Sequence, residues 1–407
     1  MEKRKAVITG IGVVTSIGTN RREFWQNLIA GKTGIGRIDL FDTAQYRVTI
    51  AAQARGFSGR DHFASRECRR LSRSDLLGLV AAREALEEIP FNTPALPPDR
   101  IAVVLGAGAG GIYPAEIYRQ DLYRHKKPRY PSFLLSFPMC SLTDHIGNRW
   151  GLTGPRATID TACSSTITAI GLGLDFIQRN QADLVITGGS ESLSQLTFSG
   201  FNALKALDPE PCRPFDRTRR GLSLGEGAAL LILEEKEKAR ERGAPVYAEV
   251  LGYGTSGDAH HITAPHPEGR GAILSMERAI ARAGLSAEDI DFINAHGTAT
   301  PANDPIETRA IKKVFGDRAY RIPVTSIKSS IGHCLGAAGV LGAVAGILAL
   351  DQGVLPPTLH FRERDPACDL DYVFNQARKK EIQTVLCNAF AFGGNNSSIV
   401  FSKPDYE

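Results

Sequence analysis

Residues 158–180 read TIDTACSSTITAIGLGLDFIQRN, and the rest of the chain can be organised around this stretch. Residues 158–159 end a short β-prone run, and residues 160–161 offer side chains that can cap a helix. An apolar pattern from Ser164 onward predicts a buried helix, with apolar side chains at Ile167, Ile170, Leu172, Leu174 and Ile177. Cys163 then lies at the helix start, where unpaired N–H groups and the macrodipole favour a thiolate. The stretch predicts either a nucleophile or a structural cysteine in a core helix, because cysteine reactivity depends on its surroundings.

The composition is that of a globular protein with a large core. The chain has 407 residues, 43% of them hydrophobic and 23% charged, which allows about two or three domains or one duplicated unit. A formal net charge of +4 is too small to indicate nucleic-acid binding. Seven scattered cysteines without a CxxC pair predict reduced thiols in the cytoplasm. We expect no membrane span, because no apolar stretch reaches ~18 uninterrupted residues.

The order of predicted elements indicates an internal duplication. Residues 5–9 predict a buried strand that ends in the turn GIG, and residues 65–89 predict a first long helix. Later, a strand, a polar turn at residues 328–333 and an apolar helix repeat the arrangement around Cys163. Strands that alternate with helices predict an α/β architecture. We therefore expect two halves, residues 1–250, which contain Cys163, and residues 251–407, which contain His296 and His333.

A glycine pattern in residues 101–111, IAVVLGAGAGG, matches GxGxxG at Gly106, Gly108 and Gly111. A dinucleotide site needs a helix that opens at the last glycine and an acidic residue about 20 positions on. Pro114 follows instead, and then a basic, proline-broken loop. Close approach of the backbone to a ligand or to another chain explains the glycines as well. A nucleotide-binding oxidoreductase is therefore the weaker interpretation.

Two further clusters have ordinary explanations. His260, His261 and His266 lie in a predicted loop without carboxylate or cysteine ligands nearby, so we interpret them as loop histidines and expect no metal site. The arginines at positions 66, 69, 70 and 73 indicate either a solvated helix face or a docking surface for an acidic partner.

Three ionisable residues sit where predicted strands end, namely Cys163, His296 and His333. The region outside strand ends is where α/β folds place their sites. A thiol needs a partner that favours the thiolate, and histidine is the usual one. Two neutral imidazoles can also donate N–H bonds to an oxyanion that develops during a reaction. Lys328 could hold positive charge in the same pocket.

Three motifs carry a resemblance to a known family. DTACSS around Cys163, NAHGTATPANDPIE around His296 and KSSIGH around Lys328 and His333 resemble the active-site motifs of β-ketoacyl synthases, specifically the Cys-His-His enzymes of the synthase I and II type. The likeness runs over nearly the whole chain and includes CRPFDRTRRGLSLGEGAALLILE. It implies a duplicated thiolase fold with five layers, αβαβα, in a homodimer. It implies no cofactor.

The resemblance also implies a reaction. Cys163 would accept an acyl chain from an acyl carrier protein as a thioester, and malonyl-carrier protein would lose CO2 and attack it. His296 and His333 would assist decarboxylation and stabilise the enolate. The backbone N–H groups of Cys163 and Phe392 would form an oxyanion hole, with Phe392 as a gate. The acyl pocket would be lined by Gly108, Ala109, Phe133, Phe201 and Phe392.

Two positions depart from the family pattern. Many free-standing synthases carry a glutamate where this chain has Gly342, which leaves Lys328 without that partner. Ala391 replaces the glycine common before the gating phenylalanine, which would stiffen the gate. Segments such as residues 332–361 resemble polyketide ketosynthases more closely. Fatty acid elongation is the expected function, and a ketosynthase of a type II polyketide or polyene pathway is the alternative.

The partners follow from the same resemblance. The chain ends just after the last predicted core strand, so we expect the carrier protein to come in trans. Carrier proteins are acidic, which favours a docking surface made of Arg66, Arg69, Arg70, Arg73, Lys126, Lys127 and Arg129. A heterodimer with a subunit like a chain-length factor is the alternative to the homodimer. We expect no nucleic-acid partner.

Two other functions differ in class from an elongating synthase. A degradative thiolase would place a second catalytic cysteine late in the chain, but Cys387 lies five residues before Phe392 and outside the reacting loop. A non-catalytic partner subunit would lack the nucleophile, whereas Cys163 and both histidines are present.

Overall fold

The structure is a computed structural model that describes residues 4–404 except 88, 90–95 and 127–130. Within this part of the chain, ten strands join in one mixed sheet. In order across the sheet they are β10 (Val324–Thr325), β9 (Phe292–Asn294), β13 (Thr384–Phe390), β14 (Asn395–Ser402), β8 (Ala248–Gly257), β1 (Ala6–Thr15), β7 (Gly227–Glu235), β6 (Leu184–Glu191), β4 (Ile101–Gly106) and β5 (Arg156–Ile159).

The strand order shows the internal duplication directly. Each half has its five strands in the order third, second, fourth, fifth, first along the chain, β5-β4-β6-β7-β1 in one and β10-β9-β13-β14-β8 in the other. In both halves the third and fourth strands run parallel to the second, and the fifth runs antiparallel to its two neighbours. The halves meet where residues 6–8 pair with residues 248–250. The predicted division at residue 250 falls inside β8.

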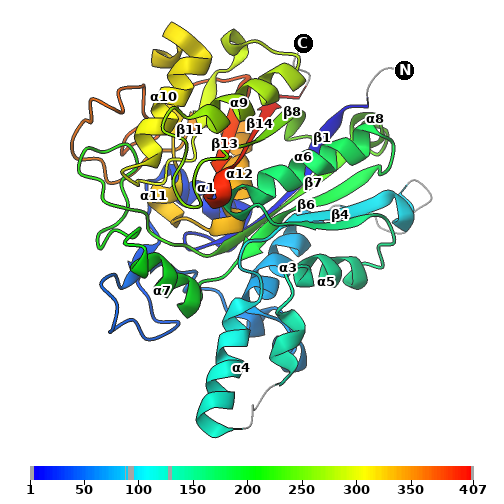
Figure 1. The fold of residues 1–407 in the computed structure, drawn as a ribbon. Coiled ribbons are helices and arrows are strands. Elements are labelled where there is room, and N and C mark those ends of the chain that lie inside the picture. Colours follow the sequence, from blue (N-terminus) through cyan, green and yellow to red (C-terminus); the bar gives the residue numbers. More distant parts are fainter. Residues whose placement is uncertain (1–3, 88, 90–95, 127–130, 405–407) are drawn as a thin grey trace.

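Helices form three layers around these two half-sheets (Figure 1). Two helices, α6 (Ser165–Gln178) and α12 (Ala338–Gln352), pack against each other between the half-sheets. One outer layer contains α3 (Arg73–Ala85) and α5 (Ser141–Arg149), and the other contains α9 (Arg270–Arg282) and α10 (Asn303–Phe315). The predicted five-layered αβαβα fold is confirmed.

The central layer explains the most apolar helix of the chain. In the described residues, one helical stretch is long and apolar enough to cross a bilayer, Leu335–Gln352, and 83% of it is buried inside the protein. A helix that is apolar on every side is typical of a buried core position. Its composition therefore follows from its place between two half-sheets.

Two predictions about the first half are wrong in detail. The strand does not end at the GIG turn, because β1 continues through it to Thr15. A Cβ at Gly10 or Gly12 would lie 2.2 or 1.8 Å from a carbonyl oxygen of α3, so the glycines allow close packing of helix on strand. The long helix expected at residues 65–89 is interrupted, with α2 (Ser65–Cys68) separate from α3. Ser72 caps α3 by accepting a hydrogen bond from the Asp75 N–H.

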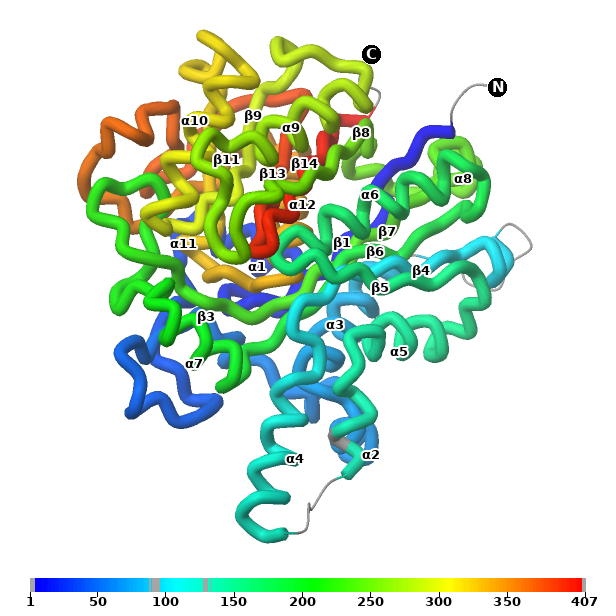
Figure 2. Tube along the Cα trace, viewed as in Figure 1, coloured from blue at the N-terminus to red at the C-terminus, as the bar shows by residue number. Residues whose placement is uncertain are grey.

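A helix opens at the end of the glycine pattern, where the sequence analysis expected none, and the basic loop expected at residues 124–133 lies partly outside the described residues. Helix α4 (Ile112–His125) starts directly after Gly111 and, with residues 131–136, projects away from the layers (Figure 2). Pro114 is compatible with this helix because it lies in the first turn, where N–H groups have no intrahelical acceptor. The remaining elements are α1 (Arg21–Ile29), β2 (Ile35–Arg37), β3 (Ile50–Ala52), α7 (Gln195–Ala203), α8 (Lys236–Glu241), α11 (Lys328–Ile331), β11 (Val354–Leu355) and β12 (Arg378–Lys379).

Candidate active site

Cys163 lies at the predicted junction, in a 3-10 turn (Ala162–Ser164) between β5 and α6. Ala162 has a φ of 51°, a left-handed conformation that is uncommon for a residue with a side chain. The Ser165 hydroxyl supports this turn by accepting from the N–H of Thr161 at 2.9 Å and lying 3.0 Å from the carbonyl oxygen of Ala107. The turn presents the Cys163 thiol just before the first residue of the central helix.

Burial dominates the ionisation of this thiol. Cys163 is only 8% exposed, and burial raises the pKa of its thiol to about 11. The positive charge of Lys328 and the backbone N–H groups of Phe392 and Cys163 lower that pKa, but they do not compensate for the lost solvation. The N–H groups thus act in the expected direction and favour the thiolate, but desolvation has the larger effect on the pKa of Cys163.

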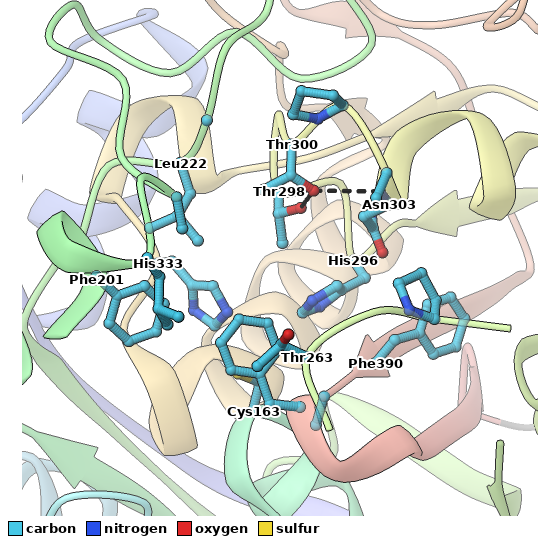
Figure 3. A pocket seen from close by; sticks show the side chains of 18 of the residues that line it. Cys163, Phe201, Leu222, Thr263, His296, Thr298, Thr300, Asn303, His333 and Phe390 are labelled. Atoms are coloured by element: carbon cyan, nitrogen blue, oxygen red, sulfur yellow. Dashed lines mark hydrogen bonds between the residues drawn. The ribbon is translucent and has the colours of Figure 1, made fainter. Parts of the chain in front are cut away.

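The two predicted histidines meet Cys163 at one cavity. His296 follows β9 and His333 follows α11, yet their ring centroids are 5.4 Å apart and the ring planes are nearly perpendicular, at 83°. Both line a cavity of about 320 Å³ together with Cys163. Figure 3 shows the two imidazole rings pointing into this cavity.

Both imidazoles are neutral. Burial, then the charges of Lys328 and His333, hold the pKa of His296 well below its usual range. Burial and Lys328 do the same to the pKa of His333. The N–H of Leu335 donates to Nδ1 of His333 at 3.1 Å, which leaves the proton of that ring on Nε2. In the described part of the chain, Nδ1 of His296 is buried without a hydrogen-bond partner.

Lys328 has a carboxylate near it despite the glycine at position 342. Its ammonium group is buried and donates to the carbonyl oxygen of His296. Burial lowers the pKa of Lys328, and the negative charge of Glu307 is the largest effect in the opposite direction. Glu307 also accepts the N–H groups of His296 and Gly297, at 2.7 and 2.8 Å. Glu307 is therefore an acidic neighbour of Lys328, the kind of partner that Gly342 cannot provide. The sequence analysis did not single out Glu307, although this residue ends the motif NAHGTATPANDPIE.

Phe392 follows β13 and lines the cavity beside the Cys163 thiol. It begins a 3-10 turn (Phe392–Gly394) in which Gly393 and Gly394 have φ values of 79° and 73°, a region that favours glycine. Its ring stacks on Phe201 with centroids 5.8 Å apart, and its N–H lowers the pKa of Cys163. Ala391 has an extended backbone that any residue adopts.

The cavity also has polar residues that the sequence analysis missed. Thr298 and Thr300 line it, with their hydroxyl oxygens 2.9 Å apart, and the Asn303 N–H donates to Thr300 Oγ1 at 3.2 Å (Figure 3). All three residues belong to the His296 motif. Their place in that motif was the available indication of a role in the site.

The predicted acyl pocket is only partly present at this cavity. Phe201 and Phe392 line it, whereas Gly108 and Ala109 are not among its lining residues. The N–H groups of those two residues donate to the carboxylate of Glu191. Although α4 opens after this glycine pattern, these N–H groups are thus occupied by a side chain of the protein. The side chain of Phe133 lies outside the described residues.

The predicted docking residues fall into three groups. Arg66, Arg69, Arg70 and Lys126 are exposed, and none of them lines the cavity of Cys163. The prediction that Arg73 belongs to the docking surface is wrong, because its guanidinium turns inward and forms an ion pair of 2.6 Å with the buried Glu226. Lys127 and Arg129 lie outside the described residues.

The predicted loop histidines lie in a loop, as expected. The rings of His260 and His266 are 5.2 Å apart, and no cluster of potential metal ligands occurs among the residues that the structure describes.

Comparisons with known proteins agree with this geometry. Residues 3–239 match the family model "Beta-ketoacyl synthase, N-terminal domain", and residues 247–362 match "Beta-ketoacyl synthase, C-terminal domain". The chain is 40% identical over 412 residues to a 3-oxoacyl-[acyl-carrier-protein] synthase 2 of Coxiella burnetii (strain RSA 493 / Nine Mile phase I), with 99% of each chain covered.

Solved structures have the same fold. The ishigamide ketosynthase/chain length factor superposes with a TM-score of 0.93 at 34% identity, covering 99% of this chain and 100% of the other. A ketosynthase solved in complex with a type II PKS acyl-carrier protein gives a TM-score of 0.90 at 29% identity, with 99% and 100% covered. With a cysteine and two histidines at one cavity of a duplicated fold, and with relatives that match from end to end, the chain belongs to the β-ketoacyl synthase family.

Proposed function

We propose that this protein is a 3-oxoacyl-[acyl-carrier-protein] synthase that elongates acyl chains for fatty acid synthesis. The observation that carries the proposal is the convergence of Cys163 with two neutral histidines on one cavity. The family relationship supports a condensing acyltransferase, and the relative from Coxiella burnetii bears this name over its whole length.

The proposed reaction has two transfers. In the first, the Cys163 sulfur bonds to the acyl carbonyl carbon, the carrier thiol leaves, and it takes up the proton of Cys163. In the second, malonyl-carrier protein loses CO2, and the electron pair of the broken C–C bond forms an enolate. The enolate carbon attacks the Cys163 thioester, whose C–S bond breaks, and the cysteine is regenerated.

The site residues have separate roles in these steps. Nε2–H of His333 and the imidazole of His296 would stabilise the thioester oxygen of the malonyl group as negative charge develops on it. Their lowered pKa values keep both rings neutral near pH 7. Neither ring therefore carries the second, acidic proton of an imidazolium, which would quench the enolate. The N–H groups of Phe392 and Cys163 would stabilise the oxyanion formed during attack on the acyl thioester. Lys328 lowers the pKa of the thiol.

The test is intact-mass analysis with a panel of acyl-carrier proteins, followed by malonyl-carrier protein. We expect Cys163 to gain the acyl mass and the product to be two carbons longer, whereas Cys163→Ala stays unmodified. His333→Ala should still be acylated but should fail to decarboxylate the malonyl group. Absence of both acylation and decarboxylation with every carrier would contradict the proposal and favour a non-elongating partner subunit.

A ketosynthase of a type II polyketide or polyene pathway is the second candidate. It is supported by Gly342 and by the likeness to the ishigamide ketosynthase/chain length factor. The same panel separates the two functions. A fatty acid elongation enzyme should prefer carrier proteins loaded with saturated acyl chains, and a polyketide or polyene ketosynthase should prefer those loaded with polyenoyl or β-ketoacyl chains. A thiolase is disfavoured because Cys387 is buried in β13 and does not line the cavity.

We further propose that an acidic carrier protein docks on the exposed cations Arg66, Arg69, Arg70 and Lys126. Ser132 and Ser136 donate to the carbonyl oxygens of Arg69 and Arg70, so these two arginines lie beside residues 131–136 of the projecting segment. Lys126 belongs to the same segment and follows the end of α4. Charge reversal at the three arginines should raise the KM for the carrier about tenfold with kcat unchanged. Arg240→Glu, at an 82% exposed side chain on α8, is the matched control. An unchanged KM, together with a large effect of Lys205→Glu at the cavity, would indicate that the carrier protein docks around Lys205 instead.

A homodimer is proposed for the assembly, and the edge of the sheet supports it. In the second half, the outer strand β10 is covered by the bridge between Val324 and Tyr372. Its counterpart β5 pairs only with β4 among the described residues, which leaves an open edge that can pair with a second copy. Sedimentation of the pure protein should show a dimer. A monomer that dimerises only with a second, different chain would favour the chain-length-factor arrangement. We propose a cytoplasmic location, which the seven free cysteines support.

A further inference from the structure

A buried carboxylate lies behind the site without a cationic partner. Glu191, the last residue of β6, is 0% exposed, and in the described residues no ion pair joins it to a lysine or arginine. Instead it accepts the N–H groups of Gly108 and Ala109 from the β4–α4 loop, and the nearby N–H of Gly336 lowers the pKa of its carboxyl. Glu191 therefore lies between the wall predicted for the acyl pocket and the turn that follows His333.

The turn after His333 is strained and tightly enclosed. Leu335 has a φ of 44°, a left-handed conformation that is unfavourable for a residue with a Cβ. A Cβ at Gly336 would lie 2.7 Å from Oε1 of Glu191, so only glycine fits beside the carboxylate. A conformation of this kind persists only where surrounding contacts determine it.

Contacts from two central elements determine this turn. The Glu191 carboxylate faces the Gly336 N–H, and the Thr166 hydroxyl on α6 donates to the Gly336 carbonyl oxygen at 2.8 Å. Thr166 Oγ1 also accepts the Val340 N–H at 2.9 Å at the start of α12. The N–H of Leu335, within the same turn, donates to Nδ1 of His333 at 3.1 Å.

We propose that Glu191, together with Thr166, is a positioning residue that holds the Leu335–Gly336 turn and thereby keeps the proton of His333 on Nε2, facing the cavity. The proposal rests on the role of His333 proposed above. Without the Leu335 donor, the neutral ring could carry its proton on Nδ1, and Nε2 would then present a lone pair to the developing oxyanion.

The carboxylate has a second, opposite influence on Cys163. Burial raises the pKa of the Glu191 carboxyl to about 7, so the group is mostly ionised at pH 8, where its negative charge raises the pKa of the thiol. The charged or titratable groups that face it are Asp160, Cys163 and Cys334. Removing the charge should therefore make Cys163 easier to ionise while His333 loses its orientation. A general loss of packing would not produce this pair of opposite effects.

The experiment compares Glu191→Gln and Thr166→Val with Ser190→Ala. The glutamine keeps one acceptor oxygen, but it replaces the other oxygen with an NH2 group and removes the negative charge. Ser190 is the preceding residue of β6, and its hydroxyl bonds outward to the Ser74 carbonyl at 2.7 Å, so this control removes a buried hydrogen bond on the opposite face of the strand. The readouts are His333 ring ¹⁵N shifts, decarboxylation of malonyl-carrier protein, and iodoacetamide alkylation of Cys163 at pH 8.

We expect wild type and Ser190→Ala to show His333 protonated on Nε2. Glu191→Gln should give mixed tautomers, a kcat for decarboxylation about 10- to 100-fold lower with KM changed less than about twofold, and faster alkylation of Cys163. Thr166→Val should shift the tautomer and kcat in the same direction by a smaller factor, and it carries the test if Glu191→Gln does not fold.

A His333 ring that keeps its proton on Nε2 in the folded variants, with kcat unchanged, would overturn the proposal. So would equal losses in Ser190→Ala, because these would indicate a packing effect. If the wild type fails to decarboxylate malonyl-carrier protein, the proposed function fails, while the ring shifts and the alkylation rate still decide the role of Glu191.

Discussion

The ammonium group of Lys328 donates a hydrogen bond to the main-chain carbonyl oxygen of His296. The residues are 32 positions apart in the chain, and both are buried. Through this contact the positive charge lies close to Cys163 and to both imidazoles, and it lowers the pKa of all three groups. The reactivity of the thiol and the neutrality of the histidines therefore depend on the same lysine.

Removing that charge should slow the thiol. In Lys328→Met the pKa of Cys163 loses the effect that opposes burial, so we expect iodoacetamide to alkylate Cys163 at least about threefold more slowly at pH 8. Peptide mass spectrometry measures the rate. Lys312→Met removes a lysine of α10 that pairs with Asp369, and it should leave the alkylation rate of Cys163 unchanged. Equal rates in wild type and Lys328→Met would contradict the electrostatic role.

The wild-type thiol should show a steep pH dependence. Because burial raises its pKa to about 11, the thiolate fraction should grow about tenfold per pH unit between pH 7 and 10. Alkylation of Cys163 by iodoacetamide in the free enzyme should follow that slope, whereas glutathione in the same reaction levels off near its own pKa. A plateau for Cys163 below pH 9 would show that the site favours the thiolate after all.

Acid should destabilise the fold through the two buried histidines. Their folded-state pKa values lie below 6.5, so below that pH the unfolded chain binds protons that the folded protein does not. The free energy of unfolding should fall as pH drops from 6.5 to 5, by up to about 1.4 kcal/mol per pH unit for each ring. Urea unfolding measures it. His333→Asn should flatten the slope, and His125→Asn, at an exposed position on α4, should not.

The close approach of Asn294 should make glycine at position 342 necessary for full stability of the fold. A Cβ there would lie 2.4 Å from Nδ2 of Asn294, so Gly342→Ala should lower the free energy of unfolding by about 1–3 kcal/mol. Gly200→Ala is the control, because Gly200 lies in α7 with no atom within 4 Å of an added Cβ, and alanine there should be neutral or stabilising. Recovery of stability in a Gly342→Ala, Asn294→Ala double variant would locate the clash, and a stable single variant would disprove it.

The sequence by itself determined the candidate reacting groups and the duplicated fold. Cys163, His296, His333 and Lys328 lie in three short motifs, and strand and helix periods are local patterns that need only neighbouring residues. The motifs therefore predicted the family, and the resemblance to that family implied the five-layered architecture. The local patterns alone predicted only a duplicated α/β arrangement.

The tertiary structure decided which side chains support those groups and in what ionisation state. Glu307 near Lys328 and Glu191 behind His333 act through backbone contacts between distant segments, and Arg73 turns inward because Glu226 lies beneath it. The raised pKa of Cys163 and the lowered pKa values of the histidines come first from burial. Burial depends on how all the layers pack together, so no local stretch of sequence contains it.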